Sequence, residues 1–136
     1  MTRDEITLVQ NSFAMLAPIT GQVAEIFYIR LFKLDPSLKP LFKGDIRQQG
    51  RLLMKMIGTA VANLHQLETI IPAVQALGQR HAGYGVQPAH YATVGTALLA
   101  TLQASLGTAF TAETRAAWTS AYTVIADQMQ AGVASV

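Results

Sequence analysis

The sequence contains no cysteine among its 136 residues. This absence excludes a disulfide framework, a thiolate metal site, an iron–sulfur cluster and a cysteine nucleophile. Charged residues are also scarce, at 13% against 51% hydrophobic residues, which is typical of a globular chain and excludes disorder. At this length residues 1–136 are expected to form one domain, which buries roughly two thirds of its unfolded surface, enough for a core and a small ligand pocket.

The net charge is low as well, at +2 from ten basic and eight acidic residues. We take these charges as too few and too scattered to indicate a nucleic-acid or membrane surface. The N-terminus is charged between Arg3 and Glu5 and shows no apolar core of a signal peptide. Residues 81–112 carry no charge, but their most apolar part, residues 91–102, is shorter than the ~20 residues of a membrane span. We therefore expect a cytoplasmic protein without stable membrane insertion.

Hydrophobic residues recur with helical periodicity, and no segment alternates with a period of two, so we predict an all-α fold. Thr2 and Glu5 have the spacing of a capping box, Asp35 and Thr111 are candidate N-caps, and Gly107 is a typical helix stop. Together with the prolines, these residues predict helices at about 2–16, 20–34, 46–64, 72–80, 88–106 and from 112 onward, with a short helical turn at 36–42.

The sequence also lacks the common catalytic motifs. It has no HExxH motif, no pair of histidines four residues apart, no nucleophile elbow and no phosphate-binding loop. Gly83 and Gly85 form a GxG pair, but no strand precedes them, as a dinucleotide site requires. Chemistry must therefore come from histidine, carboxylates, hydroxyl groups or a bound cofactor.

His81 is the histidine that its position singles out. It continues an apolar helical stripe formed by Ile70, Val74 and Leu77. One interpretation is a hydrogen-bonded core or capping histidine. The other is an imidazole ligand to a buried iron porphyrin, because histidine is a common haem ligand and haem needs an apolar cleft. We expect His65 and His90 at helix ends in solvent.

Two polar residues lie on otherwise apolar helix faces. Tyr28 is on the inward side of its predicted helix, and Gln49 precedes Leu53 by four residues. They are either an amphipathic core tyrosine and a solvated glutamine, or two donors that face one pocket and stabilise negative charge on a diatomic ligand. Ala24 and Gly50 are small enough to let the two helices cross closely and bring both donors over one spot.

Several spaced motifs together resemble one family over essentially the whole chain. They are Phe27-Tyr28, Leu31-Phe32, Asp35-Pro36, Pro40-Leu41-Phe42, Arg80-His81, Pro88-Ala89-His90-Tyr91, Val94-Gly95, Leu98-Leu99, Ala117-Trp118, Ala121-Tyr122 and Val124-Ile125-Ala126-Asp127. In order and interval these motifs resemble the single-domain bacterial globins of the flavohaemoglobin family. The resemblance implies a globin fold, a three-over-three helical sandwich around haem b.

The resemblance also implies residue roles. His81 matches the proximal iron ligand, Tyr28 and Gln49 match the distal donors, Phe42 matches the aromatic residue against the haem face, and Leu53 matches the apolar residue over the ligand. Further residues match the pocket: Tyr91 beside His81, and the wall residues Met56, Ile57, Leu77, Val86, Val94, Leu98 and Ile125.

The chain departs from the family pattern in its last helix. Val133 stands where the family has a glutamate that supports the proximal histidine, and the nearest carboxylate is Asp127, at a different point of the helix. This departure argues against a strongly basic, peroxidase-like proximal side. Gln49 in place of a distal histidine predicts a five-coordinate or weakly six-coordinate ferrous iron.

Oxygen binding through haem iron is the function that the resemblance favours, with O2, and also NO and CO, as ligands. The enzymatic alternative is nitric oxide dioxygenation with an external reductase, because we expect no reductase domain after Val136. A second alternative is a haem-based redox or gas sensor. No unusually apolar outer face is evident, so we expect a monomer or a weak homodimer.

Overall fold

The computed structural model describes residues 1–42 and 44–134, and within them the chain is helical with no strand. The prediction of an all-α fold is therefore confirmed. The α-helices are α1 (Arg3–Leu16), α2 (Thr20–Leu34), α3 (Ile46–Ala62), α4 (Ile71–Gly83), α5 (Pro88–Leu106) and α6 (Ala112–Ala134). Short 3-10 helices connect several of them: η1 (Ala17–Ile19), η2 (Pro36–Leu41), η3 (Leu64–Thr69) and η4 (Gly107–Ala109).

The helix ends follow the local signals in the sequence. The Glu5 backbone N–H donates to Thr2 Oγ1 at 3.1 Å, and the Thr2 N–H donates to Glu5 Oε1 at 2.9 Å, which completes the predicted capping box. Gly107 ends α5 with a φ of 57°, as a helix-stop glycine does. The third helix ends earlier than predicted, at Ala62, because the chain turns into η3, where Gln66 has non-helical backbone angles.

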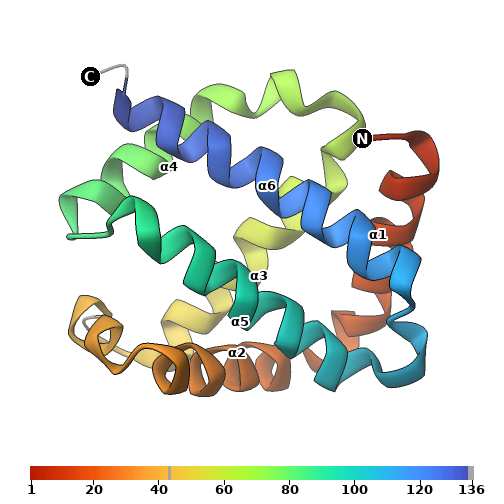
Figure 1. Cartoon of the computed structure of the whole chain (residues 1–136), viewed down its shortest axis with the longest axis horizontal. Coiled ribbons are helices and arrows are strands. Elements are labelled where there is room, and N and C mark those ends of the chain that lie inside the picture. The colour runs from red at the N-terminus through yellow and green to blue at the C-terminus, as the bar shows by residue number, and fades with distance from the viewer. Residues whose placement is uncertain (43, 135–136) are drawn as a thin grey trace.

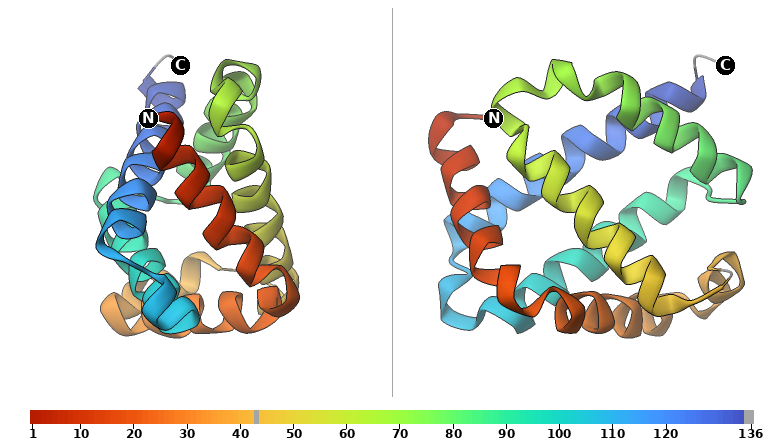
Figure 2. Two further views of the ribbon diagram at one scale, coloured as in Figure 1. Left: turned by 90° about the vertical axis from the view of Figure 1, so that its right-hand side faces the viewer. Right: turned by 180° about the vertical axis from the view of Figure 1, so that it is seen from behind.

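The helices pack in two layers of three, with α1, α3 and α4 in one layer and α2, α5 and α6 in the other (Figures 1 and 2). The most extensive packing joins α4 to α6, α2 to α5, α1 to α6 and α2 to α3. This arrangement is the three-over-three sandwich that the resemblance predicts, and the expected fold is confirmed.

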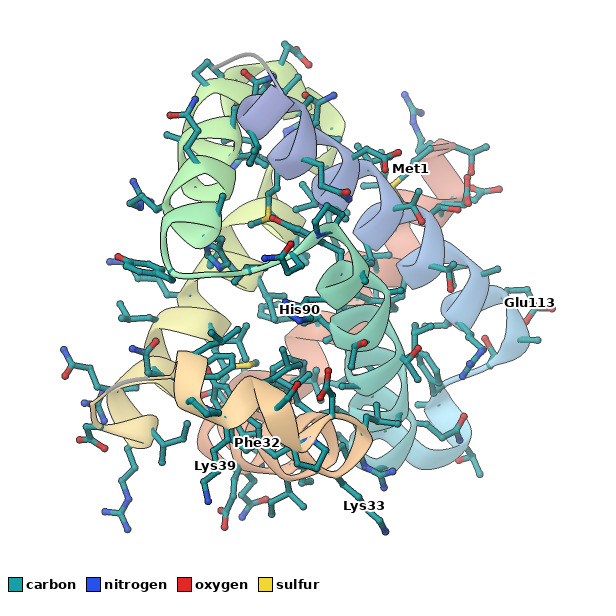
Figure 3. All side chains as sticks on the ribbon, turned by 60° about the vertical axis from the view of Figure 1, so that its left-hand side comes forward. Met1, Phe32, Lys33, Lys39, His90 and Glu113 are labelled. Carbon is teal, nitrogen blue, oxygen red and sulfur yellow. The ribbon has the colours of Figure 1, made fainter. Side chains whose placement is uncertain are left out.

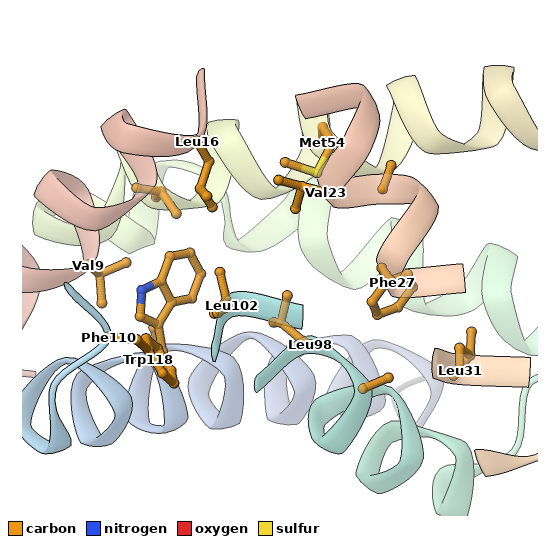
Figure 4. Close-up of a cluster of buried hydrophobic side chains, with 14 of the residues drawn as sticks. Val9, Leu16, Val23, Phe27, Leu31, Met54, Leu98, Leu102, Phe110 and Trp118 are labelled. Carbon is orange, nitrogen blue, oxygen red and sulfur yellow. The ribbon is translucent and has the colours of Figure 1, made fainter. Parts of the chain in front are cut away.

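One part of the hydrophobic core surrounds Trp118 on α6, near Val9 and Leu16 of α1 and Leu102 of α5 (Figure 4). Trp118 Nε1 donates a 2.8 Å hydrogen bond to Ser12 Oγ, and that hydroxyl donates in turn to a backbone carbonyl of α1. A cavity beside Trp118 has a volume of about 10 Å³, no more than one water molecule needs. This end of the described molecule is closely packed.

The segment Arg3–Leu34 has the length and apolar composition of a membrane-crossing helix. In the fold, however, it is two helices, α1 and α2, that run in different directions on either side of η1 (Figure 2). Val9 and Leu16 of α1 and Phe27 of α2 are buried in the core. The apolar residues of Arg3–Leu34 therefore pack within the domain.

Candidate functional site

His81 lies in the last turn of α4, and the following loop folds back onto it. The backbone N–H groups of Tyr84 and Val86 donate to the His81 carbonyl oxygen at 3.0 and 3.1 Å. Gly85 permits this return, because its φ of 96° lies in the region that favours glycine. The end of α4 is thus fixed by backbone hydrogen bonds at the residue that carries the imidazole.

The imidazole of His81 is half-buried, and one of its two nitrogens is engaged. Nδ1 lies 2.9 Å from the Leu77 carbonyl oxygen of the same helix. When Nδ1 is the donor in this bond, the lone pair of Nε2 is available to a metal. In metal-binding histidines, a hydrogen bond from the nitrogen that does not bind the metal orients the ring in this way. Burial lowers the pKa of His81, and the positive charge of Arg80 lowers it further. The hydrogen bond to the Leu77 carbonyl raises the pKa, but by less than burial lowers it. The ring is therefore kept in the neutral form that metals bind.

No acidic side chain among the described residues affects the His81 ring. Val133 is 40% exposed, and Asp127 is also on the surface. The consequence of Val133 for the proximal side stays a prediction.

A backbone-to-backbone crossing with α6 fixes the other side of α4. A Cβ atom at Gly78 would lie 2.0 Å from the Met129 carbonyl oxygen, and one at Gly132 would lie 2.4 Å from the Gln75 carbonyl oxygen. Gln79 Nε2 also donates to the Gly132 carbonyl at 3.1 Å. Gly78 precedes His81 by less than one turn, so this crossing sets the position of the histidine.

On the other side of the site, Tyr28 of α2 is the central polar group. It is 6% exposed and lies in a cluster of aromatic rings, with centroids 5.4 Å from Phe42, 5.9 Å from Phe32 and 5.3 Å from Phe27. Burial raises the pKa of its phenol to about 12, so the group stays protonated at neutral pH. Its hydroxyl makes no hydrogen bond to another described residue. The oxygen is not among the enclosed polar atoms that lack a partner, so it borders space that a polar ligand could enter.

The close crossing predicted for α2 and α3 is confirmed. A Cβ atom at Gly50 would lie 2.9 Å from Ala24 Cβ and 3.8 Å from Tyr28 Cε2. Gln49, which immediately precedes Gly50, is half-buried. The two predicted donors, Tyr28 and Gln49, are thus carried on helices in direct contact.

The helices that carry the two sides of the site leave apolar side chains only half covered. Extensive packing joins α3 to α2 and α4 to α6, but in the described structure α3 and α4 do not pack extensively on each other. The half-buried apolar residues are Phe42, Leu53, Met56, Ile57, Leu77, Val86 and Val94, whereas Leu98 is buried. An apolar group that enters between α3 and α4 would cover such side chains, and the neutral imidazole of His81 supplies an iron ligand. These residues fit a haem.

η2 and the loop after α4 approach each other. A Cβ atom at Gly85 would lie 3.3 Å from Leu41 Cδ2, which places the residue before Phe42 beside the loop that follows His81. Leu53, Ile57 and Leu98 also contact the small cavity of the packed core, so they connect the core with the candidate site.

Three predicted residues have surroundings that the sequence did not indicate. Ile125 lines a cavity of about 190 Å³ between η3, α4 and α6, with Ile70 and Val74 on its other walls. The backbone carbonyl of Tyr91 accepts a 2.6 Å hydrogen bond from the Tyr122 hydroxyl. His90 lies at the start of α5, as expected of a helix end, but it is half-buried, and its Nδ1 accepts the Gln87 N–H at 2.9 Å. His65 is exposed as expected.

Tyr122 is the residue of this region whose role the sequence reasoning missed. Its ring would contact a Cβ atom at Gly95 at 2.8 Å, so the glycine makes room for the ring where α5 crosses α6. The hydroxyl then fixes the backbone of Tyr91. A tyrosine that faces a glycine of another helix is a recognisable signal only when the pairing of the helices is known.

The fold and the site define a haem globin. A model of the globin family matches residues 25–129, and the chain belongs to this family. It is 32% identical to a flavohaemoprotein of Xylella fastidiosa over 128 residues, and 30% identical to a flavohaemoprotein of Vibrio cholerae over 129 residues. These matches cover 92% and 93% of this chain but only 32% and 33% of the two relatives, so the chain spans about a third of their length.

Solved structures agree with this assignment. A bacterial globin from Campylobacter jejuni superposes with a TM-score of 0.83 at 27% identity, covering 93% of this chain and 91% of that one. An engineered carbene transferase, made from a putative nitric oxide dioxygenase of Rhodothermus marinus, superposes with a TM-score of 0.89, covering 99% and 94% of the two chains. At 22% identity the second likeness concerns the fold alone.

Proposed function

We propose that this globin holds haem b and binds dioxygen reversibly, with His81 as the iron ligand and Tyr28 as the hydrogen-bond donor to the ligand. Bound haem supplies reversible dioxygen binding and, in the ferrous state, the electron with which dioxygen and nitric oxide form nitrate. The observation that carries the proposal is the hydroxyl of the buried residue Tyr28, which has no hydrogen-bond partner among the described residues and whose oxygen is not enclosed by protein atoms.

Each residue has a defined task in this proposal. His81 offers Nε2, while the Leu77 carbonyl holds the ring through Nδ1. Tyr28 donates a hydrogen bond and keeps its proton, because burial raises the pKa of the phenol to about 12. Gln49 provides a second polar group on the adjacent helix, and the half-buried apolar side chain of Leu53 excludes water.

Oxygen dissociation from a Tyr28→Phe variant tests the proposal. A hydrogen bond to a partly charged ligand contributes ~1.5–3 kcal/mol, so its loss should speed dissociation roughly tenfold to a hundredfold. The measurement is stopped-flow displacement of oxygen by carbon monoxide. Carbon monoxide dissociation should change much less, because that ligand carries little negative charge.

Tyr84→Phe is the matched control. Tyr84 lies in the loop after α4, and its side chain is 66% exposed. This variant should release oxygen at the rate of the unmodified protein. If Tyr28→Phe stays within about twofold of the unmodified rate, Tyr28 is not the donor and the proposal for it is wrong.

Nitric oxide dioxygenation is the second candidate, and similarity to two flavohaemoproteins at 30% identity or more supports it. In the test, the oxygenated protein is mixed with nitric oxide, and nitrate is measured per haem. A stoichiometric yield without a reductant, and repeated turnover with an added electron donor, would support the activity. Loss of nitric oxide without nitrate would contradict it.

A further inference from the structure

The basic residues are unevenly distributed, and the expectation of scattered charge is wrong. Seven of the ten lysines and arginines lie between Arg30 and Lys55, with only Asp35 and Asp45 as acidic residues in that segment. The segment has a net charge of +5, and the rest of the chain has −3. The small net charge of the chain is thus the sum of a basic segment and an acidic remainder.

The fold gathers three of these residues into one line on α3. Arg47, Arg51 and Lys55 are spaced four residues apart, and all three are exposed. We call this line the basic ridge. In a helix, residues at this spacing lie on one face, and that face is opposite to the one that carries Gln49 and Leu53. α3 therefore presents the candidate haem site on one side and the ridge on the other.

The acidic groups near the ridge do not neutralise it. The carboxylate of Asp45 accepts the Arg47 backbone N–H at 2.9 Å and caps α3, and that of Asp35 accepts the Ser37 N–H at 3.0 Å and caps η2. Within residues 1–42 and 44–134, no ion pair involves Arg47, Arg51 or Lys55. Lys33 and Lys39, on the neighbouring α2 and η2, also point away from the body of the molecule (Figure 3).

Exposed apolar side chains accompany the charges. Leu52 is 54% exposed and Ile46 is 42% exposed. Consecutive residues point about 100° apart around a helix, so these two side chains lie to either side of the ridge and not on it. The ridge face is therefore basic rather than apolar, and complementary charge is what would select a partner on it. The exposed apolar residues on α3 include no tryptophan or tyrosine, the residues that anchor proteins at membrane surfaces.

We propose that the basic ridge is the docking surface for an acidic electron-transfer protein that carries a reduced flavin and returns ferric haem to the ferrous state. The inference rests on the proposed haem function, because only a haem that is oxidised in use needs such a donor. A protein docked on the ridge is separated from the site by one helix, a thickness of about 10 Å. Complementary charge would steer the encounter.

The reaction that the ridge would serve is a single electron transfer. The anionic reduced flavin of the partner loses one electron, and the ferric iron gains it. No bond forms or breaks, and no proton needs to move. The ridge itself takes no part in this step; it raises the rate at which the donor reaches a productive position.

Two charge-reversal variants test the proposal. Arg47→Glu/Arg51→Glu changes the ridge, and Arg3→Glu/Arg115→Glu changes exposed arginines in the first turns of α1 and α6. Both variants change the net charge by the same amount, so they differ only in the place of the change. The probe is an acidic flavodoxin in its fully reduced state, mixed with the ferric haem protein in a stopped-flow instrument. Free reduced riboflavin, a small donor without a docking surface, is the reference reductant.

We expect the ridge variant to be reduced by flavodoxin at least tenfold more slowly at low salt, the control variant to change less than threefold, and added salt to remove the difference. Reduction by riboflavin should be unchanged in both. Equal slowing in the two variants, or none in either, overturns the proposal. So does tighter, ridge-dependent binding of duplex DNA or of vesicles with anionic lipid than of flavodoxin.

Binding of oxidised flavodoxin to the haem-free chain, followed by NMR chemical shifts, separates this proposal from the proposed function. Ridge-dependent shifts without haem uptake would leave the docking surface intact and refute the haem function. Normal oxygen binding without any ridge-dependent shift or rate would refute only the docking surface.

Discussion

The two ends of the molecule are built on different principles. Around Trp118, side chains from α1, α5 and α6 fill the space between the helices, and the indole N–H is bonded to Ser12. Around His81, the imidazole and neighbouring apolar side chains such as Leu77 and Val86 are only half covered. The first end is complete with protein atoms alone, whereas the second has apolar surface that a haem would cover.

The comparison indicates how a cofactor site is kept in shape by packing outside it. α4 contacts α6 backbone to backbone at Gly78 and Gly132, so the helix is fixed on the side away from the site. On the opposite side, Tyr28 is fixed by neighbouring aromatic rings and by the crossing at Gly50. Both functional groups are thus positioned by contacts that do not involve the ligand.

The largest effect is expected from removing the iron ligand. His81→Ala should abolish native iron ligation, because the Leu77 carbonyl holds the His81 ring through Nδ1 and leaves Nε2 for the iron. The measurement is the visible spectrum after haem addition, in ferric and ferrous forms. Added imidazole should restore a histidine-like spectrum in this variant.

His65→Ala is the control for this prediction, because His65 is exposed at the start of η3. Its spectra should match those of the unmodified protein. Native ligation in His81→Ala would show that another residue holds the iron. The half-covered apolar side chains around His81 would then have to be explained by something other than a haem bound to this histidine.

The next effect concerns the crossing of α4 and α6. Gly78→Ala should lower the free energy of unfolding by about 3 kcal/mol, because the new Cβ would meet a backbone carbonyl at 2.0 Å and the helices must separate. Gly83→Ala, in the same helix with nothing within 4 Å, should stabilise by up to ~1 kcal/mol. Urea unfolding of the haem-free chain measures both, and equal stability of the two variants would contradict a tight crossing.

The smallest effect is the pH dependence contributed by Tyr28. Burial raises the pKa of its phenol from 10.0 to about 12, so the folded state holds this proton more tightly than the unfolded state. The contribution to stability is complete below pH 10 and is lost as the pH rises through about 12. Tyr28→Phe should show a shallower fall of the urea midpoint across this range. An identical fall in both proteins would place the phenol in contact with solvent.

Much of the local structure could be predicted from particular residues. Thr2 with Glu5, Asp35 with Pro36, and Gly107 act on backbone groups within a few positions, so the predicted start of α1 and the predicted helix ends at Leu34 and Leu106 agree with the structure. The apolar stripe that ends at His81 and the small pair Ala24 and Gly50 could also be recognised, because helical spacing alone places such residues on one face.

Other features depended on which helices meet. Gly78 and Gly132 are 54 positions apart and are unremarkable until α4 crosses α6. The hydrogen bond from Trp118 to Ser12 joins residues 106 positions apart. Ile125 was expected near the haem and contacts a separate cavity between η3, α4 and α6. No periodicity encodes such pairings, because they depend on crossing angles and distances between elements.

The sequence by itself determined that this chain is helical, where most helices begin and end, and which histidine and tyrosine are set among apolar residues. Those properties follow from hydrogen bonds and side-chain directions within a single helix. Only the tertiary structure decided which end is filled and how closely α4 approaches α6. These features arise where separate helices are packed together, and the close packing of protein interiors fixes their distances.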